Sequence, residues 1–223
     1  MAFSTKEIVE ELKSVLKGKT IDAIIPPLVF LIMNGFTTLN IAIITSLSIA
    51  VLLGVSRLFR KQNILYVGVG FIGLTIAFLF AYLSDNASNY FLPSIIGSGF
   101  LAVMSFVSVI IKRPIAALAS HITRSWTFTW FLRKDVRPAY SEVSLLWGGY
   151  FLFRAIIQLA FLLEGSLSNL TLLNIILGLP FTVVVLIISY VYGIWRLRKL
   201  GGPGIDEYDQ GITPPYKGQT RGF

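Results

Sequence analysis

Six long apolar runs constrain this chain more than any other feature of its sequence. They cover residues 20–36, 39–59, 64–84, 94–111, 145–165 and 170–194. A helix needs roughly 20 apolar residues to cross the hydrocarbon of a bilayer. The runs also lack the polar–apolar alternation of transmembrane strands. The sequence therefore predicts an all-α fold, a polytopic membrane helix bundle with six transmembrane helices in one domain over residues 20–200.

The composition agrees with a membrane protein and excludes several other classes. Only 13% of the 223 residues are charged, against about 25% in an ordinary soluble domain. The net charge of +8 could indicate nucleic-acid binding, but basic residues beside apolar runs are typical of membrane topology. We therefore expect the lipid bilayer, and no nucleic acid, as a partner. Without cysteine, and with His121 as the one histidine, we expect no metal site and no cofactor.

The positions of lysine and arginine predict how the bundle is oriented. All 19 except Arg154 lie before the first run, after the sixth, in the connection that follows the fourth run, or at the end of the second run and in the connection after it, as Arg57, Arg60 and Lys61 do. The connections at 37–38, 85–93 and 166–169 contain none. Basic residues stay on the cytoplasmic side of a membrane. We therefore predict a multi-pass protein of a bacterial cytoplasmic (inner) membrane, with both termini in the cytoplasm.

Three segments outside the apolar runs also have distinctive patterns. Residues 1–19 combine a capping box at Ser4–Glu7 with helical apolar spacing, which predicts an amphipathic interfacial helix. The connection at 112–144 mixes tryptophan with basic residues, which predicts a second interfacial helix over about 114–131. Residues 201–223 are rich in glycine and proline, which predicts a disordered cytoplasmic tail.

Small residues recur at helical spacing in the third run. Gly68, Gly70 and Gly73 match the G-x-G-x-x-G pattern, but no strand precedes them, so a nucleotide site is rejected. Gly70, Gly73, Ala77 and Ala81 share one helical face instead. Small residues allow close helix approach, so we predict a packing face for another span or another subunit of a homo-oligomer or membrane partner.

A second small-residue stripe lies on the fourth run. It consists of Ser94, Ser98, Ala102 and Ser105. The favoured interpretation is again helix packing. The alternative is a polar lining for a solute path.

Prolines interrupt the first and sixth runs. Pro26 and Pro27 lie in the first, and Pro180 lies in the sixth. Proline removes a backbone hydrogen bond and clashes with the preceding turn, which predicts a break or kink. Broken helices bind substrate in transporters, although many membrane helices contain prolines without such a role. The adjacent pair is the stronger candidate for a break.

Arg154, near the middle of the fifth run, is the strongest indication of a functional site. Burial of arginine at that depth costs at least about 2.5–3.5 kcal/mol, so the side chain should face the protein interior or a water-filled cavity. Trp147, Tyr150 and Gln158 share its helical face. Helical side chains lean toward the helix N-terminus, which directs Arg154 toward Asp22 at the start of the first run. The pair would be either a structural ion pair or an anion or substrate site.

Several short motifs, in a fixed order, resemble a known family. They are Arg57–Lys61, Phe91–Pro93, Ile111–Pro114, Trp147–Gln158 and Gly178–Pro180. Together they resemble the bacterial membrane protein family called domain of unknown function 3159, over residues 18–200. A fainter similarity is to the intracellular septation protein A family, which implies a part in envelope assembly or division. Neither family supplies an agreed set of site residues.

Two function classes remain open, with a third behind them. The first is a small-solute or ion transporter, or a transport accessory, with a polar site around Arg154. The second is a non-catalytic scaffold of the cell envelope or of division, acting through partners at its basic face. The third, an intramembrane enzyme, is disfavoured because acids, histidine and cysteine are too sparse to form an obvious catalytic site.

Overall fold

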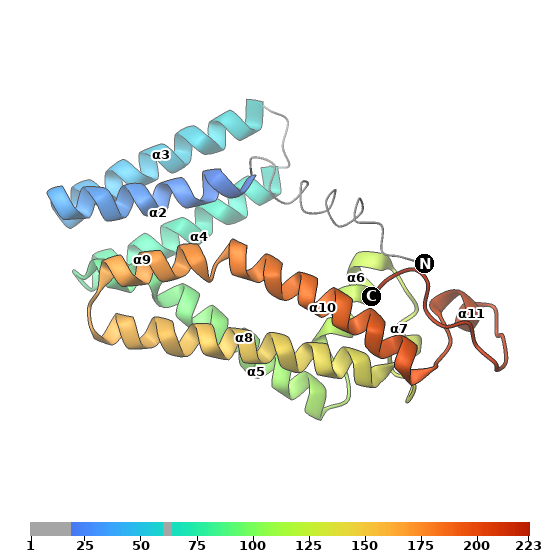
Figure 1. The fold of residues 1–223 in the computed structure, drawn as a ribbon. Coiled ribbons are helices and arrows are strands. Elements are labelled where there is room, and N and C mark those ends of the chain that lie inside the picture. Colours follow the sequence, from blue (N-terminus) through green and yellow to red (C-terminus); the bar gives the residue numbers. More distant parts are fainter. Residues whose placement is uncertain (1–18, 60–63) are drawn as a thin grey trace. The chain divides into compact units, whose positions relative to one another are not determined.

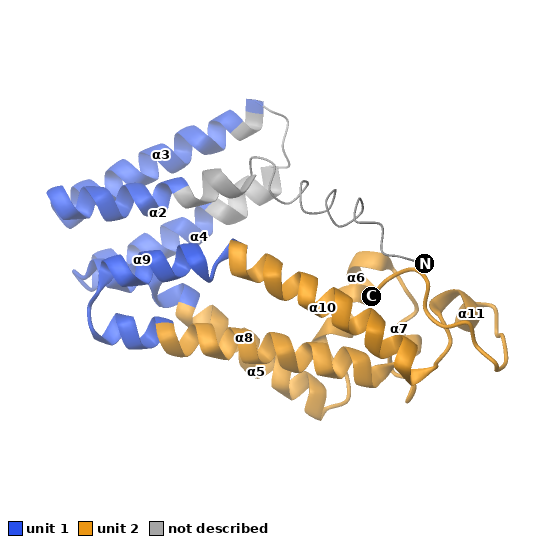
Figure 2. Ribbon diagram, in the orientation of Figure 1, with its two compact units in different colours: residues 1–94, 158–179 blue, residues 95–157, 180–223 orange. Residues whose placement is uncertain are grey.

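The computed structural model describes the backbone of residues 19–59 and 64–223. The side chains of residues 19–24, 57–58 and 64–70 are outside this description. The chain divides into two compact units: residues 1–94 and 158–179 form unit 1, and residues 95–157 and 180–223 form unit 2 (Figure 2). Every regular element in the described ranges is a helix, so the predicted all-α class is confirmed for them.

Unit 1 is a helical bundle around an aromatic core. Its elements are α2 (Lys19–Phe36), α3 (Leu39–Phe59), α4 (Ile64–Leu83), the 3₁₀ helix η1 (Ala87–Phe91), the start of α5 (Leu92–Ile110), the end of α8 (Arg137–Leu163) and α9 (Leu167–Ile176). Phe30, Phe78 and Tyr90 pack in its core with ring centroids 5.0–5.2 Å apart. These rings come from α2, α4 and η1, so burial of aromatic surface joins three separate segments.

The three connections without lysine or arginine lie at the same end of unit 1, the left end of the ribbon in Figure 1. The connection at 85–93 contacts the residue just before the connection at 166–169, because the Ser88 hydroxyl donates a hydrogen bond to the Gly165 carbonyl at 3.2 Å. Asn86 shapes one of them by accepting the Ser88 N–H at 2.9 Å, which caps η1. The connections that share a predicted side of the membrane are thus close together within this unit.

Unit 2 contains the remaining helices and a second core. Its elements are the rest of α5, α6 (Ile115–Arg124), α7 (Phe128–Phe131), the first part of α8, nearly all of α10 (Leu179–Leu200) and α11 (Ile205–Asp209). Trp130, Phe131 and Tyr140 are fully buried there, with ring centroids 4.8–6.0 Å apart. The aromatic-rich connection predicted to lie on the membrane surface therefore forms much of a protein core.

Four helical segments are long and apolar enough to cross a membrane by length and composition. They are Leu39–Ser56, Ala87–Ile110, Arg137–Leu163 and Leu167–Leu200. Two further apolar helices, Ile25–Phe36 and Phe71–Leu83, are shorter within the described side chains. These helices are compatible with a membrane protein, and the number of six spans and the cytoplasmic placement of the termini stay predictions. The predicted interfacial helix over 1–19 falls outside the described residues, except Lys19, which begins α2.

The predicted helix break in the first run is absent. α2 is continuous through Pro26 and Pro27, as membrane helices permit when neighbouring groups satisfy the freed carbonyls. The sixth run is the one that breaks: α9 ends at Ile176, α10 begins at Leu179, and Pro180 is in the first turn of α10. Proline fits there because the first amides of a helix have no intrahelical partner. Gly178 is required at the turn, since an added Cβ would lie 2.3 Å from the Asn174 carbonyl oxygen.

The central connection forms two helices where one interfacial helix was predicted over 114–131. Ser125, in the left-handed conformation with φ 56°, separates α6 from α7. Trp130 and Phe131 are buried in unit 2, whereas Leu118 and Ile122 of α6 are 46% and 70% exposed. Only the amphipathic character of α6 agrees with the prediction. The Trp130 and Phe131 side chains of α7 are instead buried in the core of unit 2.

The segment 201–223 is ordered, so the predicted disordered tail is wrong. It contains α11 and packs on unit 2, where the Phe223 ring stacks on Tyr140 with centroids 4.2 Å apart. The Trp130 indole donates a hydrogen bond to the Pro203 carbonyl at 2.9 Å. Its glycines permit close backbone contact: a Cβ on Gly204 would lie 2.6 Å from the Gly218 carbonyl oxygen. A composition typical of disorder here serves tight packing.

Candidate functional site

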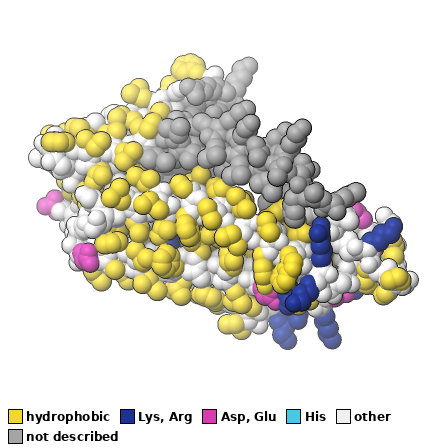
Figure 3. All heavy atoms as spheres, viewed as in Figure 1, with side chains coloured by type: hydrophobic (Ala, Val, Ile, Leu, Met, Phe, Trp, Pro, Cys, Tyr) yellow, Lys and Arg dark blue, Asp and Glu magenta, His cyan; other side chains and the backbone are white. Residues whose placement is uncertain are grey.

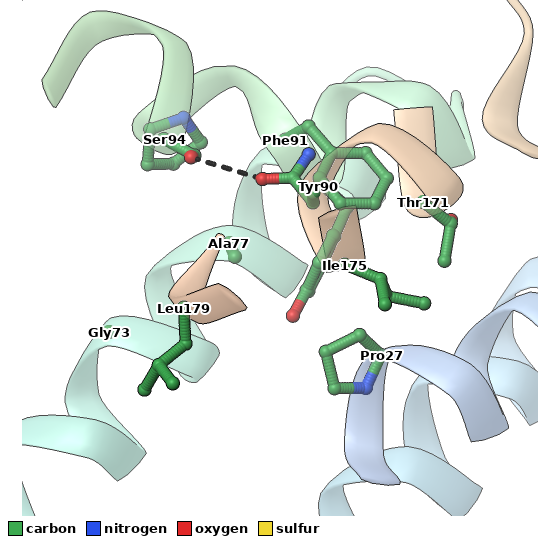
Figure 4. Close-up of a pocket in the computed structure, with 11 residues that line it drawn as sticks. Pro27, Gly73, Ala77, Tyr90, Phe91, Ser94, Thr171, Ile175 and Leu179 are labelled. Atoms are coloured by element: carbon green, nitrogen blue, oxygen red, sulfur yellow. Dashed lines mark hydrogen bonds between the residues drawn. The ribbon is translucent and has the colours of Figure 1, made fainter. Parts of the chain in front are cut away.

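Three uncharged polar side chains meet inside unit 1. Ser94 lies near the start of α5, Gln158 lies toward the end of α8, and Asn174 lies on α9. Gln158 is fully buried and its Nε2 donates to Asn174 Oδ1 at 2.8 Å and, at the longer distance of 3.5 Å, to Ser94 Oγ. The Ser94 hydroxyl donates to Asn174 Oδ1 at 3.5 Å (Figure 4). We call these three residues the polar cluster.

Backbone geometry fixes which way the two amides of the polar cluster face. Asn174 Nδ2 donates to the Leu170 carbonyl at 2.9 Å, which turns Asn174 Oδ1 toward Gln158. Gln158 must then present its NH₂ group to that oxygen, and its Oε1 is left buried without a hydrogen-bond partner. A buried acceptor without a donor costs about 1–3 kcal/mol. The polar cluster therefore contains one acceptor that a donor group would stabilise.

A cavity of about 350 Å³ adjoins the polar cluster within unit 1. Figure 4 shows its walls, which come from α2, α4, η1, α5, α9 and the first residue of α10. The lining residues are Pro27, Gly73, Ala77, Tyr90, Phe91, Pro93, Ser94, Thr171, Asn174, Ile175 and Leu179. Ser94 and Asn174 belong to both the cavity and the polar cluster, so the cavity has a polar region in a mainly apolar wall.

Tyr90 adds a further polar group to the cavity. Its ring is held between Phe30 and Phe78, and the residue is only 8% exposed. In Figure 4 the Tyr90 hydroxyl points into the cavity, toward Pro27 and Leu179. A phenol hydroxyl can donate and accept, so it could contact either kind of ligand group.

The small-residue face of α4 divides into two parts. Ala81 is fully buried in the core of unit 1, and Ala77 packs against that core and also lines the cavity. Gly73 is exposed and lines the cavity, with no atom within 4 Å of an added Cβ. The surroundings of Gly70 are outside the part of the chain that the structure describes. Small residues therefore serve packing at one end of the face and leave room for the cavity at the other.

The serine stripe of α5 divides in the same way. In unit 2, Ser105 is 1% exposed and lies opposite Gly148 of α8, where an added Cβ would be 3.1 Å from the Ser105 Cβ. The Ser105 hydroxyl is satisfied within its own helix by the Leu101 carbonyl at 2.7 Å. Ser105 thus fits the packing interpretation, and Ser94 fits the alternative of a polar lining.

The residues predicted around Arg154 are placed in two different units. In unit 2, Trp147 and Tyr150 form an edge-to-face pair with centroids 5.9 Å apart, and the Tyr150 hydroxyl lies 2.7 Å from Thr182 Oγ1. Arg154 is half-buried on the same helix and is not a lining residue of the cavity described above. Gln158 belongs to unit 1. The predicted site around Arg154 stays a prediction.

The proposed partner of Arg154 also stays a prediction, because the side chain of Asp22 is outside the described set. Asn174 is the main residue that sequence reasoning missed. Its signal was an amide within an apolar run, sixteen residues after the amide of Gln158. Only the fold shows that these two amides meet.

Some charged side chains in unit 2 form ion pairs. Arg196 contacts Glu142 through two nitrogens at 2.8 Å, and the Tyr192 hydroxyl donates to the same carboxylate at 2.6 Å. Arg133 contacts Asp135 at 2.8 Å, and this hydrogen bond holds the pKa of the Asp135 carboxyl below its ordinary value. Within the described part of the chain, no group of three or more His, Cys, Asp or Glu side chains could hold a metal ion.

The helical fold and its long apolar helices are compatible with an α-helical integral membrane protein. The chain belongs to the family described as "Protein of unknown function (DUF3159)", whose model matches residues 17–198. The match includes the polar cluster, the cavity and Arg154, and it ends before the segment 201–223. No curated protein and no solved structure matches the chain. The fainter resemblance to the intracellular septation protein A family stays a prediction.

Proposed function

We propose that the protein binds a small solute in the cavity of unit 1 and transports it, or assists its transport, across a bacterial cytoplasmic membrane. The observation that carries this proposal is the polar cluster of Ser94, Gln158 and Asn174 beside a cavity in a unit made of apolar helices. Apolar cavities with a few convergent polar groups are typical ligand sites. Polar groups within membrane helices are costly and commonly mark a functional pathway.

The helix break supports the same proposal. Ile175 and Leu179 line the cavity on either side of the break at Leu177 and Gly178. In transporters, discontinuous helices expose backbone groups beside the substrate. The break in the sixth run therefore lies at the proposed site, whereas the prolines of the first run contribute Pro27 to the wall without breaking their helix.

The proposed topology has six spans with both termini in the cytoplasm. Its support is the distribution of lysine and arginine, together with the three connections without basic residues at one end of unit 1 (Figure 1). On the face drawn in Figure 3, most lysine and arginine side chains gather at one end of unit 2, away from the broad hydrophobic surface of its helices. Such segregation follows from the positive-inside rule.

The natural chain has no cysteine, so single cysteines can test the proposed site directly. We expect Ser94→Cys in the full chain, in membrane vesicles, to react with a membrane-impermeant maleimide. The control is Ile96→Cys on the same helix, 58% exposed, which should face lipid and react slowly. Equal, slow reaction at both positions would contradict a solute site open to water.

One observation favours a scaffold as the alternative function. The ordered segment 201–223 gives unit 2 a folded surface with three acidic and two basic side chains on the side predicted to be cytoplasmic, which a partner could contact. Complementation of a deletion strain separates the two proposals. Transport predicts that Ala77→Phe, which fills the cavity, abolishes function. A scaffold predicts that removal of residues 201–223 abolishes function and that Ala77→Phe does not.

An intramembrane enzyme is not proposed. Among the side chains that the structure describes, those that line the cavity include no His, Asp, Glu, Lys or Arg. General acid–base catalysis would need at least one titratable group near the reacting atoms. Tyr90 alone does not form such a set.

A further inference from the structure

We infer that the cavity of unit 1 accepts an uncharged molecule with an apolar body and one hydrogen-bonding group, such as a hydroxyl or an amide. This inference rests on the proposed function and names its ligand class. It differs from the sequence-based expectation of an anion site at Arg154. Three properties of the cavity carry it: the charge of its wall, the hydrogen-bonding groups in it, and its size.

The described part of the cavity wall carries no charge. None of the lining residues whose side chains the structure describes is acidic or basic. Asp85 and Glu164 of unit 1 are exposed at the connections between helices and do not line it. An ion that left water for this wall would lose its hydration without gaining a counter-charge, which is far more costly than burial of a neutral polar group. The wall therefore selects against carboxylates, phosphates and ammonium groups.

The hydrogen-bonding groups of the wall favour a ligand with a hydroxyl or an amide. Ser94 and Asn174 line the cavity, and Gln158, which does not line it, donates to both of them through Nε2. The Tyr90 hydroxyl points into the same cavity and can both donate and accept. A ligand hydroxyl or amide could hydrogen-bond to such groups, whereas a plain hydrocarbon offers them no hydrogen bond.

The size of the cavity limits the apolar body of the ligand. A volume of about 350 Å³ is at the low end of the range for small-molecule sites. Phe91, Ile175 and Leu179 supply apolar contacts around it. This space fits one short alkyl chain or a compact ring system and does not fit a whole phospholipid.

Photolabelling with a matched series of probes tests the inference. The probes are decanol, decanoic acid, decylamine and decane, each with a diazirine at the same chain position, applied at neutral pH to the full chain in lipid nanodiscs. We expect decanol to label residues 71–94 and 167–179 at least roughly tenfold more than the acid, the amine or the hydrocarbon, as loss of one buried hydrogen bond or burial of one charge implies. Excess unlabelled decanol should compete.

Variants of the cavity make the photolabelling specific. Ala77→Phe should abolish decanol labelling, and Leu79→Phe, at a half-exposed position of the same helix, should preserve it. Ser94→Ala and, separately, Tyr90→Phe, at two positions that line the cavity, should lower decanol labelling toward that of decane. Two independent variants are used so that misfolding of one does not decide the result.

The outcomes separate the inference from the proposed function. If decanoic acid or decylamine labels the cavity as strongly as decanol, the ligand class is wrong and a solute site remains. If decane labels as strongly as decanol, or if no probe labels the cavity, the ligand class is also wrong. If Ser94→Cys is in addition unreactive toward maleimide, the proposed solute site itself is wrong.

Discussion

The two units of this molecule treat their polar side chains in opposite ways. Unit 1 buries uncharged groups, and one of them, Gln158 Oε1, has no partner. Unit 2 contains most of the described charges, and its acids are held in pairs such as Glu142–Arg196 and Asp135–Arg133. Paired charges stabilise a fold without a ligand, whereas an unsatisfied buried acceptor costs stability. This contrast is the reason why we propose a binding site in unit 1 and not in unit 2.

The largest expected effect is the loss of an aromatic side chain from the core of unit 2. Trp130 is fully buried and also donates a hydrogen bond to the Pro203 carbonyl. Trp130→Ala should destabilise the protein by about 3–5 kcal/mol and expose the segment 201–223 to protease. Thermal unfolding in detergent and limited proteolysis measure both effects. Trp195→Ala, at a position 53% exposed, is the control and should change little; equal destabilisation would refute the assignment of this core.

A smaller loss is expected when one ion pair of unit 2 is broken. Glu142→Leu removes the acceptor of both Arg196 and Tyr192, which are only half-buried. The expected destabilisation is about 1–3 kcal/mol, reduced by solvent screening of the exposed part. Glu142→Leu combined with Arg196→Leu should recover part of the loss in a double-mutant cycle. Simple additivity would show that the pair contributes nothing as a pair.

The same kind of change in unit 1 should have almost no cost. Gln158→Leu removes the unsatisfied acceptor, and it also removes the 2.8 Å donor to Asn174 Oδ1. Asn174 Oδ1 keeps the Ser94 hydroxyl at 3.5 Å, and Asn174 Nδ2 keeps its bond to the Leu170 carbonyl. We expect the free energy of unfolding to change by less than about 1 kcal/mol, or to rise, because a buried polar group is replaced by an apolar one. Destabilisation as large as that of Glu142→Leu would remove the contrast between the units.

The smallest expected effect concerns pH and the segment 201–223. The Glu207 carboxylate accepts backbone N–H groups of Gly204, Lys217 and Gly218 at 2.7–3.0 Å, and these bonds lower its pKa, the Gly204 bond most. A lowered pKa in the folded state gives stabilisation that is complete above the ordinary value of about 4.3 and is lost as pH falls through the lowered one.

Hydrogen exchange, corrected for intrinsic rates, measures this effect at the amides of Gly204, Lys217 and Gly218. They should stay protected at neutral pH and lose protection only in acid, and Glu207→Gln should reduce protection already at neutral pH. Asp206→Asn, which removes an exposed pair with Arg221, is the control. Protection that does not change with either pH or Glu207→Gln would exclude this role of the carboxylate.

Apolar patterning predicted the helices well and their breaks poorly. The second run was predicted at 39–59 and forms a helix over Leu39–Phe59. The length and hydropathy of a run are local properties, so the sequence alone is enough to predict such a helix. Pro26 and Pro27 were given more weight than Pro180, although position within the helix decides whether proline is tolerated. The break instead depends on Gly178, whose close contact with Asn174 no local pattern displays.

The candidate site was predictable only in part. Gln158 could be recognised as an amide within an apolar run, but its partners Ser94 and Asn174 lie far away in sequence and depend on the packing of α5, α8 and α9. The order of residues 201–223 could not be predicted either, since glycine-rich sequence permits both disorder and close backbone packing. In both regions, contacts between residues far apart in the sequence determine the structure, and composition does not.

The central claim, that unit 1 contains an open solute site and unit 2 a closed core, is tested most directly by two serines of α5. Ser94 lines the cavity, and Ser105 is packed against α8 in unit 2. Each is replaced by cysteine in the naturally cysteine-free chain, alone and with Ala77→Phe, and the rate of maleimide labelling is measured in vesicles. The account predicts rapid labelling of Ser94→Cys that Ala77→Phe suppresses, and negligible labelling of Ser105→Cys. Equal rates at both positions, unaffected by Ala77→Phe, would contradict it.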